Sequence, residues 1–297
     1  MNVPVSPSGR HHGAVTLTVG QVRALLTAGD LRPSRALGQN FVVDPNTVRR
    51  IVRLADVSPG QAVIEIGAGL GSLTLALAEA GARVTAVEID HRLVPLLRSQ
   101  VSSHGVTVVE ADALRLDWTS LASAGADGVP VDGGWMLVAN LPYNVAVPVI
   151  VRVLDEAPFV RSLFVMVQRE VGERLAATPG TKTYGAVSVK VAYHATAAVV
   201  GRVPPAVFFP RPRVESVLVR LDRRPAVAVD PATVAPGRLF AVVQAGFAHR
   251  RKMLRRALED VVAPAAFTAA GVDPSARAEE LSVKEWGRLA VERTAGR

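Results

Sequence analysis

The chain has 297 residues with no cysteine, a formal net charge of +8, and hydrophobic residues at 49% of its positions. This length suits one large domain and a second small one, and the lack of cysteine excludes disulfides and thiolate metal sites. The six histidines are scattered, no apolar run reaches about 20 residues, and no apolar signal core opens the chain. We therefore expect a cytoplasmic protein with no metal site and no membrane span, and the positive surplus predicts a polyanionic partner.

The first part of the chain predicts a flexible start and then an α/β domain. Residues 1–15 are rich in Pro, Ser, Gly and His, and we predict a flexible N-terminus over 1–17. A helix from Thr18 to Ala28, capped by Thr18, should follow. Strands and helices then alternate, which predicts a mostly parallel sheet with helices on both faces and an antiparallel pair at its end. The expected strands are 62–66, 83–88, 106–110, 135–139, 161–167, 197–203 and 214–221.

The last part of the chain predicts a small helical domain. The strand pattern stops after Arg224, and residues 237–293 carry helical periodicity that is broken near Pro264 and Pro274. We predict an α/β domain at 18–223 and a small helical domain at 224–297. No helix is patterned as a dimer seam, so we expect a monomer.

A glycine-rich turn follows the first strand of the α/β domain. Gly67, Gly69 and Gly71 stand at alternate positions before an apolar helix. Glycines at this spacing let the backbone pass close to a ligand, and the helix N-terminus supplies free N–H groups. The dinucleotide fingerprint needs a third glycine where this chain has Ser72. The turn therefore suits a ligand without a pyrophosphate, such as S-adenosylmethionine.

Carboxylates at successive strand ends complete a predicted nucleoside pocket. Glu65 precedes the glycine turn and could hold it in shape. Glu88 ends the second strand, about 20 residues after the glycines, where a carboxylate can accept hydrogen bonds from both ribose hydroxyls. Asp112 follows the third strand and could receive an adenine amine. The residues after the last two acids, Ile89 and Ala113, are included in the predicted cofactor site.

The segment Asn140-Leu141-Pro142-Tyr143 follows an apolar strand and suits a flat base with an exocyclic amine. The Asn140 side-chain oxygen and the Leu141 carbonyl can accept hydrogen bonds from such an amine, and Pro142 has no N–H to compete for that carbonyl. Tyr143 offers an aromatic face for stacking. We predict that these four residues form the catalytic site, with Asn140 also bordering the cofactor.

Basic residues cluster late in the chain with few acids between them. Arginines grip phosphates, and each neutralised phosphate adds salt-dependent affinity, so we predict contact with RNA. The residues expected to make this contact are Arg211, Arg213, Arg250, Arg251, Lys252 and Arg255.

Together these motifs resemble the rRNA adenine-N6 dimethyltransferases, and most of all their KsgA/RsmA type, over residues 18–293. Three further segments carry the resemblance: Leu37 to Phe41, Val203 to Ser216, and Phe247 to Leu258. In the family the first segment closes over the methionine end of the cofactor, which implies that Gln39, Asn40 and Phe41 bind it. In the second, the resemblance puts the aromatic that stacks on the target base at Phe208.

The resemblance implies a Rossmann-like, S-adenosylmethionine-dependent methyltransferase sheet in the α/β domain at 18–223, and a helical domain at 224–297 that binds RNA or the ribosome. It also implies transfer of methyl groups from S-adenosylmethionine to N6 of two adjacent adenosines near the 3′ end of 16S rRNA. The substrate would be the small ribosomal subunit or its precursor, during ribosome biogenesis. Three alternatives stay open: an erythromycin-resistance type enzyme that acts on 23S rRNA, a non-catalytic ribosome-assembly factor with the same fold, and a DNA adenine methyltransferase. Resistance enzymes commonly have Ile where this chain has Leu141, which favours the small-subunit reading.

Overall fold

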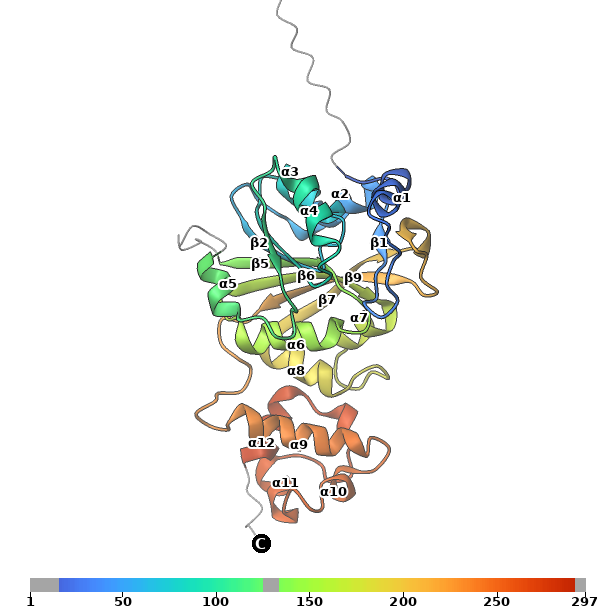
Figure 1. Cartoon of the computed structure of the whole chain (residues 1–297). Coiled ribbons are helices and arrows are strands. Elements are labelled where there is room, and N and C mark those ends of the chain that lie inside the picture. Colours follow the sequence, from blue (N-terminus) through green and yellow to red (C-terminus); the bar gives the residue numbers. More distant parts are fainter. Residues whose placement is uncertain (1–15, 125–133, 292–297) are drawn as a thin grey trace, which may run out of the picture.

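The computed structural model describes residues 16–124 and 134–291 (Figure 1). The first described helix, α1 (Val19–Ala28), begins after Thr18 as predicted, and a capping box with Gln21 closes its first turn. Residues 1–15 of the predicted flexible N-terminus lie outside the described residues. The prediction is wrong for Thr16 and Leu17, which are 0% and 4% exposed, because Leu17 packs into the same hydrophobic cluster as α1.

The centre of the α/β domain is a seven-stranded sheet with the order β4-β3-β2-β5-β6-β9-β7. The strands from β4 to β6 are parallel, and β9 is antiparallel to both of its neighbours. The predicted antiparallel pair is confirmed, with β9 lying between β6 and β7. The bounds are β2 (Ala62–Ile66), β3 (Arg83–Glu88), β4 (Thr107–Glu110), β5 (Trp135–Asn140), β6 (Val160–Gln168), β7 (Ala195–Val203) and β9 (Ser216–Arg223).

Helices cover both faces of this sheet, as the alternation predicted (Figure 1). Successive strand residues point to opposite faces, so Val63 packs with α1 to α4 while Ile64 packs with α5, α6 and α8. These helices are α2 (Pro45–Ala55), α3 (Ser72–Glu79), α4 (Val94–Val101), α5 (Trp118–Ala124), α6 (Ala146–Glu156), α7 (Arg169–Leu175) and α8 (Ala186–His194).

A second, two-stranded sheet was not predicted from the sequence. Strand β1 (Phe41–Val42) pairs antiparallel with β8 (Phe208–Phe209), and a short 3-10 helix, η1 (Pro205–Val207), precedes β8. Each strand has only two residues, too few to show an alternating pattern. The pair ties the N-terminal segment to the loop between β7 and β9.

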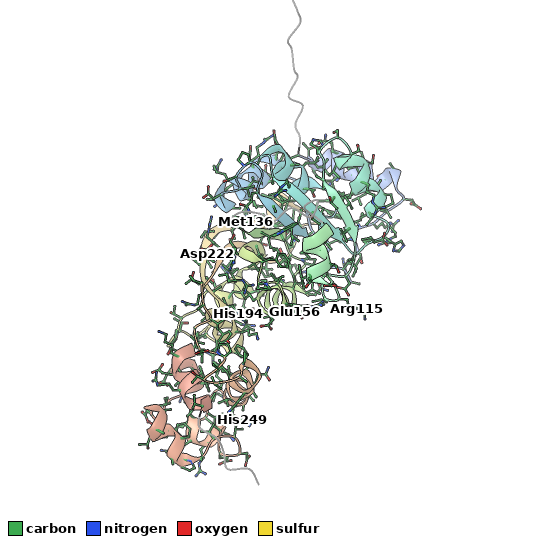
Figure 2. All side chains as sticks on the ribbon, turned by 90° about the vertical axis from the view of Figure 1, so that its left-hand side faces the viewer. Arg115, Met136, Glu156, His194, Asp222 and His249 are labelled. Carbon is green, nitrogen blue, oxygen red and sulfur yellow. The ribbon has the colours of Figure 1, made fainter. Side chains whose placement is uncertain are left out.

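The C-terminal helices form a separate hydrophobic cluster that packs against α8 (Figures 1 and 2). Trp286 lies at 0% exposure in this cluster, and Tyr184 donates a hydrogen bond to the Leu281 carbonyl across it. The predicted breaks are confirmed, since Pro264 starts α11 and Pro274 precedes η2. The elements are α9 (Pro236–Ala248), α10 (Leu254–Ala257), α11 (Pro264–Ala270), η2 (Ala278–Glu280) and α12 (Val283–Val291). None of the helices in the described part of the chain is long and apolar enough to cross a membrane.

The strand order creates a switch point between β2 and β5. The chain runs from β2 outward to β3 and β4, then crosses back to form β5 on the other side of β2. In open α/β sheets, ligands bind at such a point, beyond the carboxyl ends of the strands. The predicted glycine turn, acids and Asn140 all lie at or just beyond the carboxyl ends of strands β2 to β5.

Candidate active site

The glycine turn after β2 brings backbone rather than side chains to the switch point. Gly67, Gly69 and Gly71 have φ of 73°, 59° and 91°, a region that residues with a Cβ rarely adopt. At Gly69 an added Cβ would also lie 3.0 Å from the ring of Phe41. Gly71 then precedes α3, whose first N–H groups have no intrahelical partner. The turn therefore offers a cradle that a ligand can approach closely.

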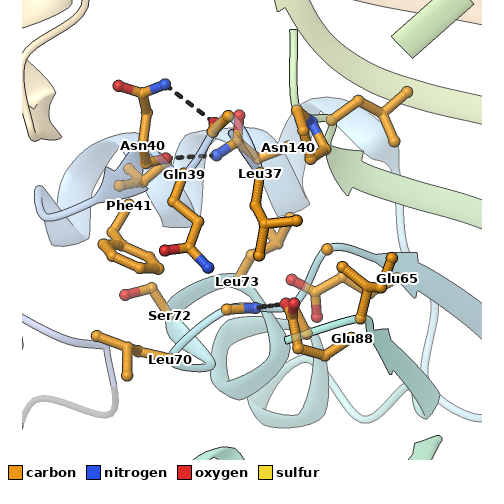
Figure 3. Close-up of a pocket in the computed structure, with 18 of the residues that line it drawn as sticks. Leu37, Gln39, Asn40, Phe41, Glu65, Leu70, Ser72, Leu73, Glu88 and Asn140 are labelled. Atoms are coloured by element: carbon orange, nitrogen blue, oxygen red, sulfur yellow. Dashed lines mark hydrogen bonds between the residues drawn. The ribbon is translucent and has the colours of Figure 1, made fainter. Parts of the chain in front are cut away.

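Glu88 holds this turn in place from the end of β3. One carboxylate oxygen accepts from the Gly69 N–H at 2.7 Å (Figure 3). The other accepts from the Asp90 N–H at 2.9 Å. Burial raises the pKa of Glu88, and the bonds from backbone N–H groups oppose that rise. Each oxygen has a second lone pair, so the side chain can still accept from ribose hydroxyls. Glu88 thus has a structural role beside its predicted one.

Glu65 is a buried acid with an unused oxygen in the same pocket. The residue is 2% exposed, and its Oε2 has no hydrogen-bond partner among the described residues. Burial, and to a smaller extent the nearby charge of Glu88, raise the pKa of Glu65 to about 8. The carboxyl is therefore neutral at pH 7 in the free protein. Its free oxygen is a position that a ligand ammonium or hydroxyl group can use.

Residues 37–41, called the lid here, close one side of the pocket (Figure 3). The Asn140 side-chain N–H donates to the Asn40 carbonyl at 3.0 Å, and the Gln39 side-chain N–H donates to Asp90 at 2.9 Å. Asn144 holds the preceding turn by donating to the Ala36 carbonyl. The lid is therefore fixed to the ends of both β3 and β5. All three predicted lid residues, Gln39, Asn40 and Phe41, line the pocket.

Asp90 was not predicted as a site residue. It is 4% exposed, and its two oxygens accept from Arg92 and Gln39. The hydrogen bonds from Arg92, together with that from Gln39, lower the pKa of Asp90 to about 2. Both ends of the Gln39 amide are engaged, because its oxygen also accepts from the Ser34 N–H at 2.7 Å. The position of Asp90, two residues after Glu88, was the only signal in the sequence that could have pointed to this residue.

The tie to Asn40 orients the Asn140 amide. Because Nδ2 donates to a carbonyl, the amide oxygen is identified and is left to accept from a ligand. Among the described residues, none donates to the Leu141 carbonyl, while the Leu141 N–H bonds to Met166 on β6. Two acceptors thus stand next to each other at the end of β5. This is the arrangement that the sequence predicted for an exocyclic amine.

Tyr143 lines the pocket and is anchored from behind. Its hydroxyl lies 2.7 Å from the hydroxyl of Ser216, a residue of β9 that is fully buried. Burial raises the pKa of Tyr143, so the phenol stays protonated at neutral pH. Ser216 ends one of the segments that carry the family resemblance, but it was not predicted as a site residue.

Phe208 is not brought together with Asn140. Its side chain is 4% exposed, belongs to the cluster that contains Val42, and does not line the cofactor pocket. The register of β8 against β1 fixes it there. Stacking of Phe208 on a target base remains a prediction, and it requires the ring to move out of this contact.

A second hollow adjoins the first and is mostly apolar. It shares Gly67, Ile89 and Pro142 with the lid pocket and is also lined by Asp112 and Ala113. Ile89 is 47% exposed, which is unusual for a large aliphatic side chain and leaves an apolar wall uncovered. One Asp112 oxygen accepts from the Leu114 N–H at 2.8 Å. The shape and lining suit a flat heterocycle beside one acid.

The predicted RNA-contacting residues divide into exposed and engaged groups. Those with exposed side chains are Arg211, Arg213, Arg251, Lys252 and Arg255. Arg250 is different, because it pairs with Glu279 at 3.2 Å and donates to the Lys182 carbonyl. Arg223, the last residue of β9, also bonds to backbone carbonyls, at the end of α6, and burial lowers its pKa. Arg223 and Arg250 serve the fold.

Comparison with known proteins decides the family. A family model described as ribosomal RNA adenine dimethylase matches residues 32–294. The chain belongs to this family. It is accordingly an S-adenosylmethionine-dependent enzyme that dimethylates adenine in ribosomal RNA, as the resemblance implied.

Relatives and solved structures agree with this membership. Ribosomal RNA small subunit methyltransferase A of Kineococcus radiotolerans is 50% identical over 292 residues, covering 94% of this chain and 92% of that protein. The protein of the same name from Thermobifida fusca is 48% identical, covering 93% and 96%. The 23S rRNA methyltransferase ErmE has a TM-score of 0.63 at 28% identity, covering 84% of this chain and 98% of that one. A dimethyladenosine transferase from Plasmodium falciparum, at 21% identity and TM-score 0.65, covers 83% and 94% and shares the fold.

The described residues fit S-adenosylmethionine as the methyl donor. The cradle at Gly69 has no room for a Cβ, and the buried Glu65 keeps an unpartnered oxygen at the same pocket. The predicted roles would put the ribose at Glu88 in the lid pocket and the adenine in the apolar hollow beside Asp112. The methionine end would then lie under the lid.

Proposed function

We propose that the chain transfers methyl groups to N6 of two adjacent adenosines near the 3′ end of 16S rRNA in the small ribosomal subunit or its precursor. The enzyme would act as a monomer in the cytoplasm, during ribosome biogenesis. The observation that carries the chemistry is the Asn140 amide, which is held by the Asn40 carbonyl with its oxygen free beside the Leu141 carbonyl. The names of the most similar relatives support the choice of the small subunit.

The chemistry asks for acceptors rather than a strong base. The lone pair of adenine N6 is delocalised into the ring, and the amine is already neutral at neutral pH, so N6 needs no deprotonation before it attacks. Once the methyl is bonded and the carbon–sulfur bond is broken, N6 carries a positive charge and loses one proton to solvent. Hydrogen bonds from N6 to Asn140 and Leu141 favour a tetrahedral nitrogen and strengthen as positive charge grows on it. S-adenosylmethionine supplies an electrophilic methyl group on a sulfonium. The side chains therefore need only to orient N6 toward that methyl and to hold it there.

Base stacking and access complete the scheme. Tyr143 presents a ring whose hydroxyl is anchored by Ser216, so the ring is fixed before the base arrives. A base inside a helix cannot reach this pocket, so the adenosine is extruded or already unpaired. The exposed cations Arg211, Arg213 and Arg251 add salt-dependent attraction for the RNA backbone.

The test is methyl transfer from labelled S-adenosylmethionine to purified ribosomal particles. Small subunits from a strain without the modification are compared with large subunits and with protein-free rRNA, and the product is digested to nucleosides. We expect N6,N6-dimethyladenosine from small subunits alone. Label in large-subunit RNA would overturn the proposal in favour of a resistance-type activity. Cofactor binding without label in any substrate would favour an assembly factor with a silent site. The molar mass of the purified protein, measured by light scattering, tests whether it is a monomer.

A further inference from the structure

A third hollow, apart from the two cofactor pockets, adjoins the β1–β8 pair. It has a volume of about 700 Å³ and is open to solvent. It is lined by α1 through Val19 and Arg23, by Asp44 at the start of α2, and by residues 206–211 around β8. No residue of the cofactor pockets takes part in it. The reaction scheme above uses only Arg211 of this lining, as an exposed cation for the RNA backbone, and gives the hollow itself no role.

The hollow contains an arginine stacked on an aromatic ring and a second arginine with an exposed side chain. The Arg23 guanidinium lies 5.1 Å from the centroid of the Phe209 ring, and Arg211 is exposed nearby. Neither arginine forms an ion pair with any described residue. Asp44 is the one acid in the lining, and its Oδ2 accepts from both the N–H and the hydroxyl of Thr47 as the cap of α2.

This composition fits one kind of ligand better than any other. A planar guanidinium that rests on an aromatic ring presents its other face for stacking, and nucleic-acid bases stack on such surfaces whatever their sequence. Arginine also binds phosphate oxygens with two parallel hydrogen bonds. The hollow thus offers a flat surface on which a base can stack and, beside it, a cation that can bind a phosphate. These are the two features of a site for an unpaired nucleotide.

The position of the hollow relates that nucleotide to the target base. Phe209 pairs directly with Phe41, and paired strands lie roughly 5 Å apart. Asn40, the residue before Phe41, carries the carbonyl that holds the Asn140 amide. Strand β8, which lines the hollow, is therefore the direct neighbour of the lid that orients the acceptor. When an adenosine enters the pocket, its neighbour in the chain must pass close to this strand.

We propose that the hollow is a subsite for the unpaired nucleotide that flanks the adenosine under methylation. Its base stacks on the Arg23–Phe209 pair and its phosphate bonds to Arg211. The inference rests on the proposed function and extends it to a second adenosine. Because stacking uses the face of the base and not N6, the subsite accepts the neighbouring adenosine both before and after dimethylation. One enzyme can then modify two adjacent positions without releasing either from the surface.

Two variants test the subsite without turnover. Arg23→Gln removes the cation from an exposed position, and Phe209→Leu keeps apolar volume but removes the aromatic face. Arg98→Gln on α4, whose packing is with α3 and β4, is the matched control for loss of one exposed charge. Binding of a fluorescent, unpaired RNA with two adjacent adenosines is measured by anisotropy over a range of salt, with S-adenosylhomocysteine present. Calorimetry of S-adenosylhomocysteine checks that each variant is folded.

We expect Arg23→Gln and Phe209→Leu each to weaken RNA binding by about tenfold, with cofactor affinity within about twofold of wild type. RNA affinity equal to that of the control variant, with cofactor affinity intact, would overturn the subsite. This outcome is separate from failure of the proposed function. If the particle assay puts label in the large subunit while both variants still lose RNA affinity, the small-subunit assignment falls and the subsite stands.

Discussion

The buried acid Glu65 makes a quantitative prediction about stability and pH. Its pKa is about 8 in the folded protein and 4.5 when unperturbed. As pH rises from 5 to 8.5, the carboxyl loses its proton readily in the unfolded chain but keeps it to a higher pH in the folded protein. The free energy of unfolding therefore falls. The difference of three and a half pKa units corresponds to about 5 kcal/mol in full, and to roughly 4 kcal/mol over this pH interval. Stability from this group is complete below pH 4.5 and is lost as pH approaches 8.

The substitution that isolates this effect is Glu65→Gln, which keeps the shape and removes the ionisation. Melting temperatures of wild type and variant are compared from pH 5 to 8.5, so that all other titrating groups cancel in the difference. We expect the melting temperature of the variant, relative to that of wild type, to rise by on the order of 10 °C between pH 5 and pH 8.5. Glu79→Gln, at an exposed position on α3, should show no such gain. A difference between Glu65→Gln and wild type that stays flat across the pH range would refute the reasoning.

Three further predictions concern the lid and the acceptors. Asn140→Ala should lower kcat by at least about 100-fold and weaken cofactor binding by only about 3- to 10-fold, the loss of one hydrogen bond; wild-type turnover would contradict it. Asp90→Asn, which weakens the tie to Gln39, should weaken cofactor binding by about tenfold while kcat at saturation holds; calorimetry with unchanged affinity would argue against a fixed lid. Gly69→Val should abolish detectable cofactor binding and cost about 2 kcal/mol of stability, because φ is 59° and a Cβ there meets an aromatic ring; a variant that still binds would show that the turn can relax.

Elements with a local cause were predictable from the sequence. The seven long strands and the cap at Thr18 depend on residues within a few positions, and the structure confirms them. The cluster of Glu65, Glu88 and Asn140 at one edge was also predictable. Parallel strands end on the same side of a sheet, so residues that follow them must gather there.

What the sequence did not reveal depends on partners far along the chain. Asp90 becomes important only because Gln39, 51 residues away, reaches its carboxylate. Strand β8 exists only because β1 lies beside it, and that pairing buries Phe208 where the resemblance expected a free ring. Arg250 was predicted to contact RNA, yet its donors bond to Glu279 and to the Lys182 carbonyl, 29 and 68 residues away in the chain. The composition gives the number of cationic side chains, but the fold determines which of them keep their donors available for a ligand.

The bond between Asn140 and Asn40 joins lid closure to the reaction itself. An isolated asparagine amide can rotate and present either its oxygen or its N–H groups to an incoming amine. Here the lid carbonyl occupies an N–H at 3.0 Å, so the oxygen is presented only while the lid is in place. The lid in turn is held by Asp90, whose own N–H bonds to the proposed ribose ligand Glu88. The acceptor for the base and the ribose position thus belong to one continuous hydrogen-bonded structure. An enzyme built in this way orients the acceptor for N6 only when the wall of the cofactor pocket is complete, which restricts the reactive geometry to the closed site.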